Sequence, residues 1–318
     1  MTAAGALVTG MGWCGSWLPA GGGDLRVLTR GAGPAGVPPG AAPPPSRPAD
    51  PATLAALFPG RWNPRRALPD GLEPLVTACL MALEEAGWWR EGMEDPVRGA
   101  LVLGSDTHPL LAAAGFAREL ADRGPVGIGP TGFLFSLPSS ATAVLGILLG
   151  LGEYQATAAE GGLSGFRAVA HALDLLRAGR ISRALIAAMS VVRAGPGAAL
   201  IPGGEEAARA GTLDLAVAFC LDSEGTGAPR SSSLPRIEEC RILDEAAAGA
   251  IPADVDEIAP AHRLLAAPSL LAVARAIERG IGGPAMLEHR EPGRPAVGRI
   301  RIVPGIDAGR REPAGSRR

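Results

Sequence analysis

Apolar residues recur along this chain with two different periods, which predicts strands that alternate with amphipathic helices. The sharpest pattern covers residues 154 to 190. An extended run from Tyr154 to Ala159 enters a glycine turn at Gly162, and from about Leu163 to Ala178 the apolar residues recur every three or four positions. A second apolar strand starts at Ile181. This stretch predicts a strand-turn-helix-strand unit whose helix buries one face.

The same two periods predict the elements on either side of this unit. Helices are expected at Leu72–Trp89 and Pro109–Arg123, in the small-residue stretch that ends at Gly150 after a short extended piece from Phe133, and in HRLLAAPSLLAVARAIERG after Ala261. Buried strands are expected at Ala6–Thr9, Ala100–Gly104, Leu213–Leu221 and Arg236–Leu243, with a final edge strand at Val297–Val303. The proline-rich segment 31–51, GAGPAGVPPGAAPPPSRPADP, is predicted to be a disordered loop. Mixed strands and helices indicate the α/β class.

Composition narrows the class of protein. The 318 residues are 47% hydrophobic with a mean hydropathy of +0.19, which is enough apolar surface for a globular core. The net charge of -2, from 30 basic and 32 acidic residues, gives no field that would attract nucleic acid or an anionic membrane. We expect no membrane span. We also expect no signal peptide, because the first residues lack a charged leader region. The four cysteines show no metal-ligand spacing, which favours reduced thiols in the cytoplasm.

One motif near the start suggests a cofactor. Gly10, Gly12 and Gly15 match the GxGxxG fingerprint of dinucleotide-binding proteins. That fingerprint requires a helix that opens at the third glycine and holds the pyrophosphate. Pro19 and the glycines at 21–23 would end such a helix within its first turns. We therefore expect no bound dinucleotide.

The turn at Gly162 raises the question of covalent catalysis. Enzymes with such a turn place the nucleophile at the helix N-terminus, where unpaired N–H groups and the helix dipole favour a thiolate or an oxyanion. Here the corner reads Glu160, Gly161, Gly162, and no cysteine lies between Cys79 and Cys220. The scaffold for a nucleophile is present without the nucleophile. Glu160 is expected to play a structural role at the helix N-terminus.

Several motifs together resemble one protein family. FLFSLPSSATAVLGILLGL and TAAEGGLSGFRAVAHALDLLRAGRISRALIAAMS, with the opening VTGMG, the helix ending EEAGWW and the segment LVLGSDT, resemble the N-terminal half of the β-ketoacyl synthases. The resemblance covers about residues 1 to 243. It implies a thiolase-like layered αβαβα fold, with a ketosynthase-like half at 1–235. A truncated C-terminal half and a basic tail would then occupy 236–318.

The resemblance also implies the loss of catalytic groups. The family's cysteine nucleophile falls on Gly162, and the helix after Ala261 places His262 on the second catalytic histidine, as a relic. The segment that would carry the first catalytic histidine is absent. Condensation needs the thiolate, both histidines and N–H groups for the oxyanion. The prediction is therefore a protein with no catalytic residue, no cofactor and no metal site.

Family members that lack the cysteine act as chain-length factors, which pair with an active ketosynthase in type II polyketide synthases, including highly reducing and aryl-polyene systems. The leading hypothesis is such a partner, which would meet the acyl carrier protein through the complex. In the family, the strand before the turn pairs with its counterpart, and the proline-serine segment reaches the partner's acyl tunnel. The expected interface and tunnel residues are Phe133, Phe135, Ser139, Ser140, Thr142, Tyr154, Gln155, Ala156, Thr157, Ala158 and Ala159. The serines and threonine have a simpler reading as helix caps or close-packing residues.

Two other hypotheses stay open. Ser164 in GLSGF, with His171 and Asp174 on the same helix, would be the centre of a residual acyl-thioester decarboxylase or hydrolase, although residues seven and ten positions on point along the helix axis. Alternatively, the chain is a free-standing acyl-binding or structural homodimer. His108 and His289 are expected to be ordinary loop residues.

Overall fold

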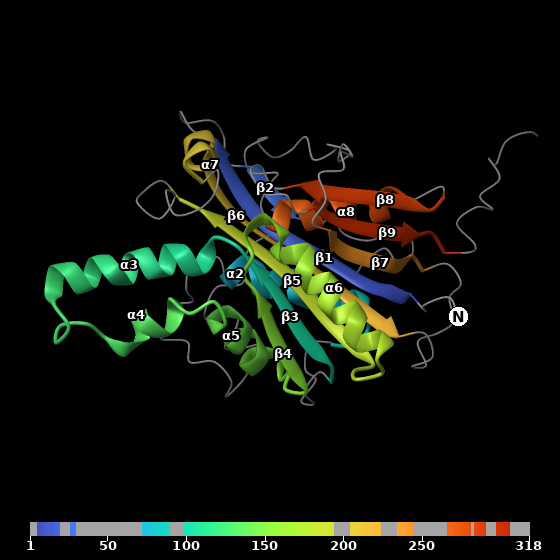
Figure 1. Ribbon diagram of the computed structural model, residues 1–318, viewed down its shortest axis with the longest axis horizontal. Helices are drawn as coiled ribbons and strands as arrows, with labels where there is room; N and C mark the ends of the chain where they lie inside the picture. Colours follow the sequence, from blue (N-terminus) through green and yellow to red (C-terminus); the bar gives the residue numbers. More distant parts are fainter. Residues whose placement is uncertain are drawn as a thin grey trace, which may run out of the picture.

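The structure is a computed structural model that describes nine stretches of the chain. They are residues 5–19, 26–29, 72–89, 98–193, 204–223, 234–243, 266–280, 283–290 and 297–305. In these stretches the chain forms one mixed sheet that carries helices on both faces (Figure 1). The predicted proline-rich loop at 31–51 and His262 lie outside the described residues.

The strands of the sheet come from the whole length of the chain. They are β1 (Ala6–Pro19), β2 (Arg26–Thr29), β3 (Ala100–Ser105), β4 (Tyr154–Ala158), β5 (Arg183–Val192), β6 (Gly211–Ser223), β7 (Arg236–Leu243), β8 (Ala285–Arg290) and β9 (Val297–Val303). Their order is β4-β3-β5-β6-β1-β7-β9-β8, with β2 paired to β1. β3 is parallel to both β4 and β5, so the carboxyl ends of these three strands meet at one end of the sheet.

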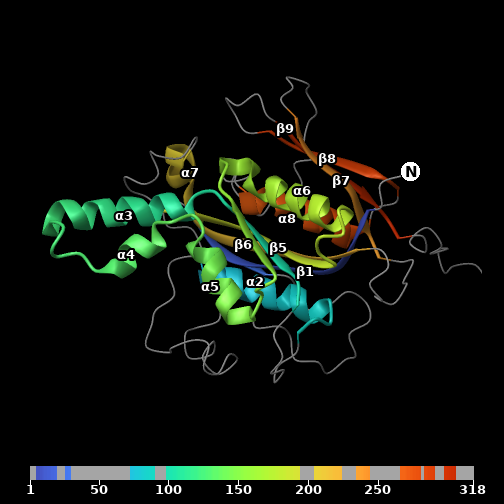
Figure 2. The same ribbon diagram turned by 60° about the horizontal axis from the view of Figure 1, so that its bottom comes forward.

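The sheet has a large and a small part, which are joined by a short ladder. β1 pairs with β7 only through Ala6 with Ile237 and Leu7 with Arg236. Beyond this ladder, β7, β9 and β8 pair antiparallel and turn over the helices, as Figure 2 shows. We call β7, β9 and β8 the small sheet and the other strands the large sheet.

Helices cover both faces of the large sheet. The helices of the described stretches are α2 (Leu72–Glu85), α3 (His108–Arg123), α4 (Pro130–Phe135), α5 (Ser140–Leu149), α6 (Ser164–Arg177), α7 (Gly204–Ala210) and α8 (Ala266–Arg279), with a 3-10 turn η1 (Gly161–Leu163) before α6. α2 and α5 pack on one face, while α6 and α8 lie between the other face and the small sheet (Figure 2). Four successive layers are thus described: helix, sheet, helix, sheet.

The glycines of the GxGxxG match lie in the strand β1, where Gly10 and Gly12 bring it close to α2 and Gly15 lies against β6. A Cβ at Gly10 or Gly12 would collide with backbone carbonyls of α2, so only glycine allows this approach. Between them, Met11 donates its backbone N–H to Glu85 Oε2 of α2 at 2.7 Å. The predicted strand at Ala6–Thr9 therefore continues through the motif to Pro19, and no helix opens at Gly15.

The middle layer confirms the buried face predicted for residues 163–178. Phe166, Val169 and Leu173 of α6 are buried in the core that α6 shares with α8 and the small sheet. Gly298 of β9 lies against the ring of Phe166, and Gly165 lies against the carbonyl of Ala266 at the start of α8. The close contact of α6 with both neighbours therefore rests on small residues.

α3 and α4 project from the body of the molecule (Figure 1). In α3 only His108 and Pro109 are buried, and the ring of Phe116 packs edge-on against Phe133 of α4 at 5.8 Å between centroids. We call α3 and α4 the arm. The sequence from 124 to 152 carries no charged residue, and it forms the two short helices α4 and α5.

The predicted helices and most predicted strands are confirmed, and three expectations were wrong. β9 is not an edge strand, because β8, which the pattern did not reveal, pairs on its outer side. The segment at Phe133, expected to be extended, belongs to α4. β1 is more than three times as long as predicted, since glycines that look like a turn serve close packing.

Candidate functional site

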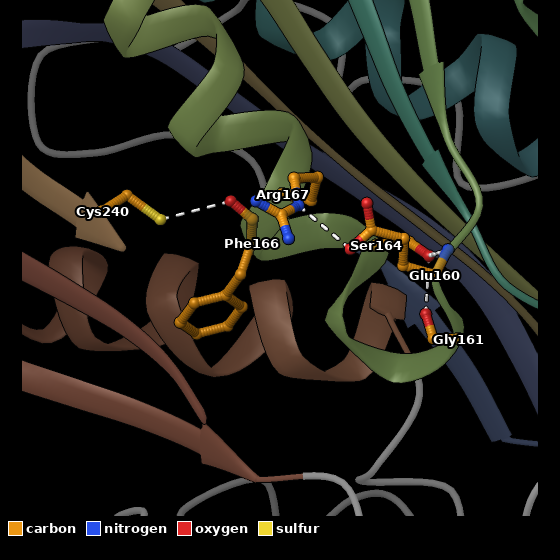
Figure 3. Close-up of polar contacts among 6 residues, drawn as sticks. All are labelled: Glu160, Gly161, Ser164, Phe166, Arg167 and Cys240. Carbon is orange, nitrogen blue, oxygen red and sulfur yellow. Dashed lines mark hydrogen bonds and ion pairs between the residues drawn. The ribbon is translucent and has the colours of Figure 1, made fainter. Parts of the chain in front are cut away.

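The strand-to-helix corner is held together by its own polar groups. After β4 the chain turns at Gly161, whose φ of +70° lies in the left-handed region that glycine adopts at little cost, and Gly162 follows as a buried residue of η1. The buried hydroxyl of Ser164 accepts the N–H of Glu160 at 2.8 Å and donates to the carbonyl of Gly161 at 2.6 Å (Figure 3). Ser164 is therefore committed to fixing the turn.

The carboxylate of Glu160 forms an ion pair at the same corner. Its Oε2 accepts from Arg167 Nε at 3.0 Å (Figure 3), with the two side chains 45% and 44% exposed. At that exposure, solvent screening leaves the pair little net stabilisation. The arrangement agrees with the structural role expected for Glu160.

A second polar cluster, which the sequence pattern did not reveal, lies where β3 and β5 end. Asp106 Oδ1 accepts the backbone N–H of Thr107 at 2.6 Å and its hydroxyl at 2.9 Å. Asp106 Oδ2 accepts the hydroxyl of Ser190 at 2.9 Å and the N–H of Ala266, the first residue of α8, at 2.6 Å. Burial raises the pKa of Asp106 to about 6, because desolvation outweighs these hydrogen bonds. The only available signal was a polar SDT immediately after a buried strand.

The residues of the residual-enzyme hypothesis are not brought together. Ser164 is bonded within the corner, whereas His171 Nε2 lies 2.7 Å from the hydroxyl of Tyr154. Asp174 is 77% exposed and lies 3.9 Å from Arg177. A hydrolase needs the hydroxyl bonded to the histidine and the histidine to the acid. The structure therefore gives this trio no catalytic arrangement.

His108 and His289 occupy buried positions. His108 begins α3 and is 3% exposed, and His289 of β8 is 1% exposed and stacks on the ring of Phe166 with 5.7 Å between centroids. The expectation of ordinary loop residues was therefore wrong for both. Across the described stretches, no group of three or more His, Cys, Asp or Glu side chains is placed to hold a metal ion. No helix in those stretches is long and apolar enough to cross a membrane.

The predicted interface strand forms an edge of the large sheet. β4 is bonded to β3 on one side and ends the strand order on the other. Gln155 is exposed, the other residues of β4 are half-buried, and Ala159 follows the strand as an exposed residue. None of these residues is charged, although edge strands of soluble proteins are commonly protected by charges. β4 thus has the character of an edge that another strand can cover.

The second group of predicted residues lies beside β4. Thr142 of α5 is buried, and its hydroxyl lies 2.5 Å from that of Thr157 on β4. Ser140 begins α5 and donates to the carbonyl of Leu137 at 2.8 Å, while Ser139 precedes α5 without a side-chain cap. Phe133 and Phe135 belong to α4, immediately before this segment. The structure thus brings Thr142 and Thr157 together, and it assigns Ser140 to a turn and not to a helix cap.

Exposed apolar side chains gather on the arm, on α5 and on the loops that join them. Of the large hydrophobic residues exposed in the described part of the chain, all but Met286 lie there. They are Leu120, Val126, Phe133, Leu134, Leu137 and Ile147. Val126 is 99% exposed and Ile147 62%. Such a concentration is typical of a surface that binds another protein.

No family model and no curated protein matches the sequence. Solved structures do match the fold. The ishigamide ketosynthase/chain length factor superposes with a TM-score of 0.56 and 16% identity, over 94% of this chain and 99% of its own. The type II polyketide synthase complex AntDE:AntF, an acyl-carrier protein with its ketosynthase bound to the hexaketide, gives 0.57 and 10% identity over 95% and 99%. This chain has the thiolase-like ketosynthase fold. The predicted layered α/β class is thereby confirmed.

Proposed function

We propose that this chain is a non-catalytic, chain-length-factor-like subunit that pairs with an active ketosynthase and shapes the acyl tunnel of a type II polyketide or polyene synthase. The observation that carries the proposal is the corner, where Gly162, on which the resemblance places the family's cysteine, has no side chain to acylate. The acyl carrier protein would reach the complex through the active partner. The fold neighbours, which include a ketosynthase/chain length factor, support this choice.

No sulfur elsewhere in the chain replaces the missing nucleophile. All four cysteines are free and buried. Burial raises the pKa of Cys14 to about 11 and raises the pKa values of the Cys79, Cys220 and Cys240 thiols as well. A thiol that stays protonated and covered is a poor nucleophile. Free buried thiols also suit the cytoplasm, the compartment we propose.

Pairing along β4 is supported by the chemistry of that edge. The strand is uncharged and unprotected, and the exposed apolar residues of the arm and α5 continue on the same side through the Thr142–Thr157 contact. A partner that adds a strand to β4 would cover both at once. The predicted tunnel residues Phe133, Phe135, Ser139 and Ser140 would lie within the covered area.

The first experiment tests the absence of catalysis. The purified chain is incubated with acyl and malonyl carrier-protein thioesters, and intact mass and released CO₂ are measured. We expect neither an acylated protein nor CO₂, with the same chain mixed with an active ketosynthase as the positive control. An acyl adduct that turns over on this chain alone would overturn the proposal.

The second experiment tests the partner. The chain is co-expressed with a ketosynthase encoded beside it that keeps its cysteine and both histidines, and the mass of the complex is measured by light scattering after size exclusion. We expect a stable one-to-one heterodimer. A homodimer that ignores the ketosynthase would support the free-standing alternative instead.

A matched pair of variants locates the interface. Leu134→Asp places a charge on the arm and Met286→Asp places the same charge on β8, at 55% and 49% exposure, so neither disturbs the core. We expect Leu134→Asp to weaken the heterodimer by at least about tenfold and Met286→Asp to leave it unchanged. Equal effects would remove the arm from the interface.

A change in product length tests the tunnel. Ser140 is half-buried at the start of α5, and Ser140→Phe adds bulk to the predicted wall. In the assembled complex we expect shorter products, measured by mass spectrometry of released chains. An unchanged product distribution from an intact heterodimer would mean that the tunnel does not cross this subunit, while the pairing itself would stand.

A further inference from the structure

The first turn of α8 is held by polar groups at the ends of β3 and β5. Asp106 Oδ2 accepts the N–H of Ala266, and Ser190 Oγ accepts the N–H of Ala267 at 3.0 Å. All of these groups are buried. The first N–H groups of a helix have no acceptor within the helix itself. Here two of them find acceptors on the large sheet.

The carboxylate that accepts these bonds is itself fixed. Thr107 donates to Asp106 Oδ1 through both its N–H and its hydroxyl, and Ser190 donates to Oδ2. The hydroxyl of Thr107 also accepts the N–H of Val191 at 2.7 Å. With both carboxylate oxygens engaged, the side chain of Asp106 cannot rotate without breaking bonds to β5 or to α8.

α8 shares a buried core with the large sheet, whereas the small sheet is paired to the large sheet by a short ladder. The small sheet reaches β1 through two residue pairs only. The start of α8 also crosses α6 at Gly165, where a Cβ would lie 2.9 Å from the carbonyl of Ala266. The position of the first turn of α8 therefore affects how both α8 and the small sheet sit on α6.

We infer that Asp106 is a latch, because its hydrogen bonds dock α8 on the ends of β3 and β5. Loss of these bonds lets α8 and the small sheet open without unfolding the large sheet. Proteins open locally in cooperative units, at a lower free energy than that of global unfolding. The inference does not depend on the proposed function.

Asp106→Asn is the direct test, because an amide has one acceptor oxygen and one donor nitrogen. In either orientation of the amide, the backbone N–H of Thr107 or that of Ala266 faces a donor. Asp222→Asn is the matched control. Asp222 of β6 is 1% exposed and bonds Arg183 at 3.0 Å, at the start of β5, whereas Asp106 and Ser190 meet near its end.

Hydrogen–deuterium exchange of the full chain, read by mass spectrometry, reports the opening. For Asp106→Asn we expect peptides of α8, β7 and β9 to exchange at least about tenfold faster than in the wild type, since a buried bond to a charged group is lost. Peptides of α2, which packs on the other face, should not change. Asp222→Asn should leave α8 at the wild-type rate.

Unchanged α8 exchange in Asp106→Asn would overturn the latch, and so would equal acceleration in Asp222→Asn. If Asp106→Asn does not fold, Ser190→Ala decides, because it removes the acceptor of the Ala267 N–H and keeps the carboxylate. Faster exchange of α8 but not of α2 in Ser190→Ala supports the latch. Equal exchange of α8 in Ser190→Ala and the wild type contradicts it.

Discussion

The corner and the arm lie on opposite sides of β4 in sequence, and they differ in what their side chains are free to do. At the corner, Gly162 is buried and the buried hydroxyl of Ser164 makes two hydrogen bonds. Leu134 of the arm is 55% exposed, and Val126, in the loop between the two helices of the arm, is 99% exposed. The polar groups of the corner are bonded to each other, whereas apolar side chains of the arm are exposed to solvent.

This difference separates two things that an active ketosynthase does with one fold. Catalysis needs polar groups that remain available to a substrate, and at this corner such groups are bonded to each other. Association needs apolar area that remains uncovered, and the arm provides it. The described structure therefore separates bonded polar groups at the corner from exposed apolar side chains at the arm, which is the contrast that the proposed function uses.

The largest expected effect on the free energy of unfolding comes from adding one methyl group beside the corner. A Cβ at Gly104 would lie 2.5 Å from the carbonyl oxygen of Ser164 and 2.7 Å from the nitrogen of Gly165, and backbone atoms cannot move aside as a side chain can. We expect Gly104→Ala to lower the free energy of unfolding by about 3 kcal/mol or more, measured by urea denaturation. Gly152→Ala, where nothing lies within 4 Å, should change it by less than about 0.5 kcal/mol. Similar values for both would mean that the corner is not tightly packed.

The second effect is a dependence on pH from Asp106. Its pKa is about 6 in the fold and 3.8 ordinarily, so between these values the folded protein holds a proton that the unfolded chain releases. Its contribution to the free energy of unfolding is therefore present in acid and is lost as pH rises through about 6. Asp106→Asn removes this contribution. The difference between wild type and variant should fall by about 2 kcal/mol from pH 4.5 to 7.5. A difference that stays constant between pH 4.5 and 7.5 would mean that groups other than Asp106, which are present in both proteins, cause the dependence on pH.

A smaller effect comes from removing a hydroxyl in each region. Ser164→Ala leaves the N–H of Glu160 and the carbonyl of Gly161 without their buried partner, so we expect a loss of about 2 kcal/mol in the free energy of unfolding. Ser136→Ala removes an exposed bond to the carbonyl of Phe133, which water can replace. That change should stay within about 0.5 kcal/mol. Equal losses would show that burial does not distinguish the two sites.

The helix α6 and the contacts of Asp106 differ in how well the sequence predicted them. The period of three and four in residues 163–178 identified α6 and its buried face, because local patterns determine such features. The contacts of Asp106 with Ser190 and Ala266 join residues 84 and 160 positions apart, and no local pattern contains that information.

Sequence patterns were also misleading where one residue type serves two purposes. Gly10 and Gly12 look like a nucleotide-binding turn, but they allow α2 to approach β1. β8 escaped prediction because AMLEHR is short and mixes charged with apolar residues. Glycine reports a close approach of backbone as readily as a turn, and only the packed structure distinguishes them.

The smallest expected effect is a stabilisation, opposite in sign to the destabilisation expected for Gly104→Ala. Gly115 lies within α3, a Cβ there meets nothing within 4 Å, and alanine favours a helix more than glycine does. We expect Gly115→Ala to stabilise α3 by about 0.5 to 1 kcal/mol. Because α3 is buried only at its first two residues, the gain should appear as slower hydrogen exchange in α3 rather than as a higher urea midpoint. A loss of stability would mean that the arm packs on the body more tightly than its exposure indicates, and the contrast with the corner would fail.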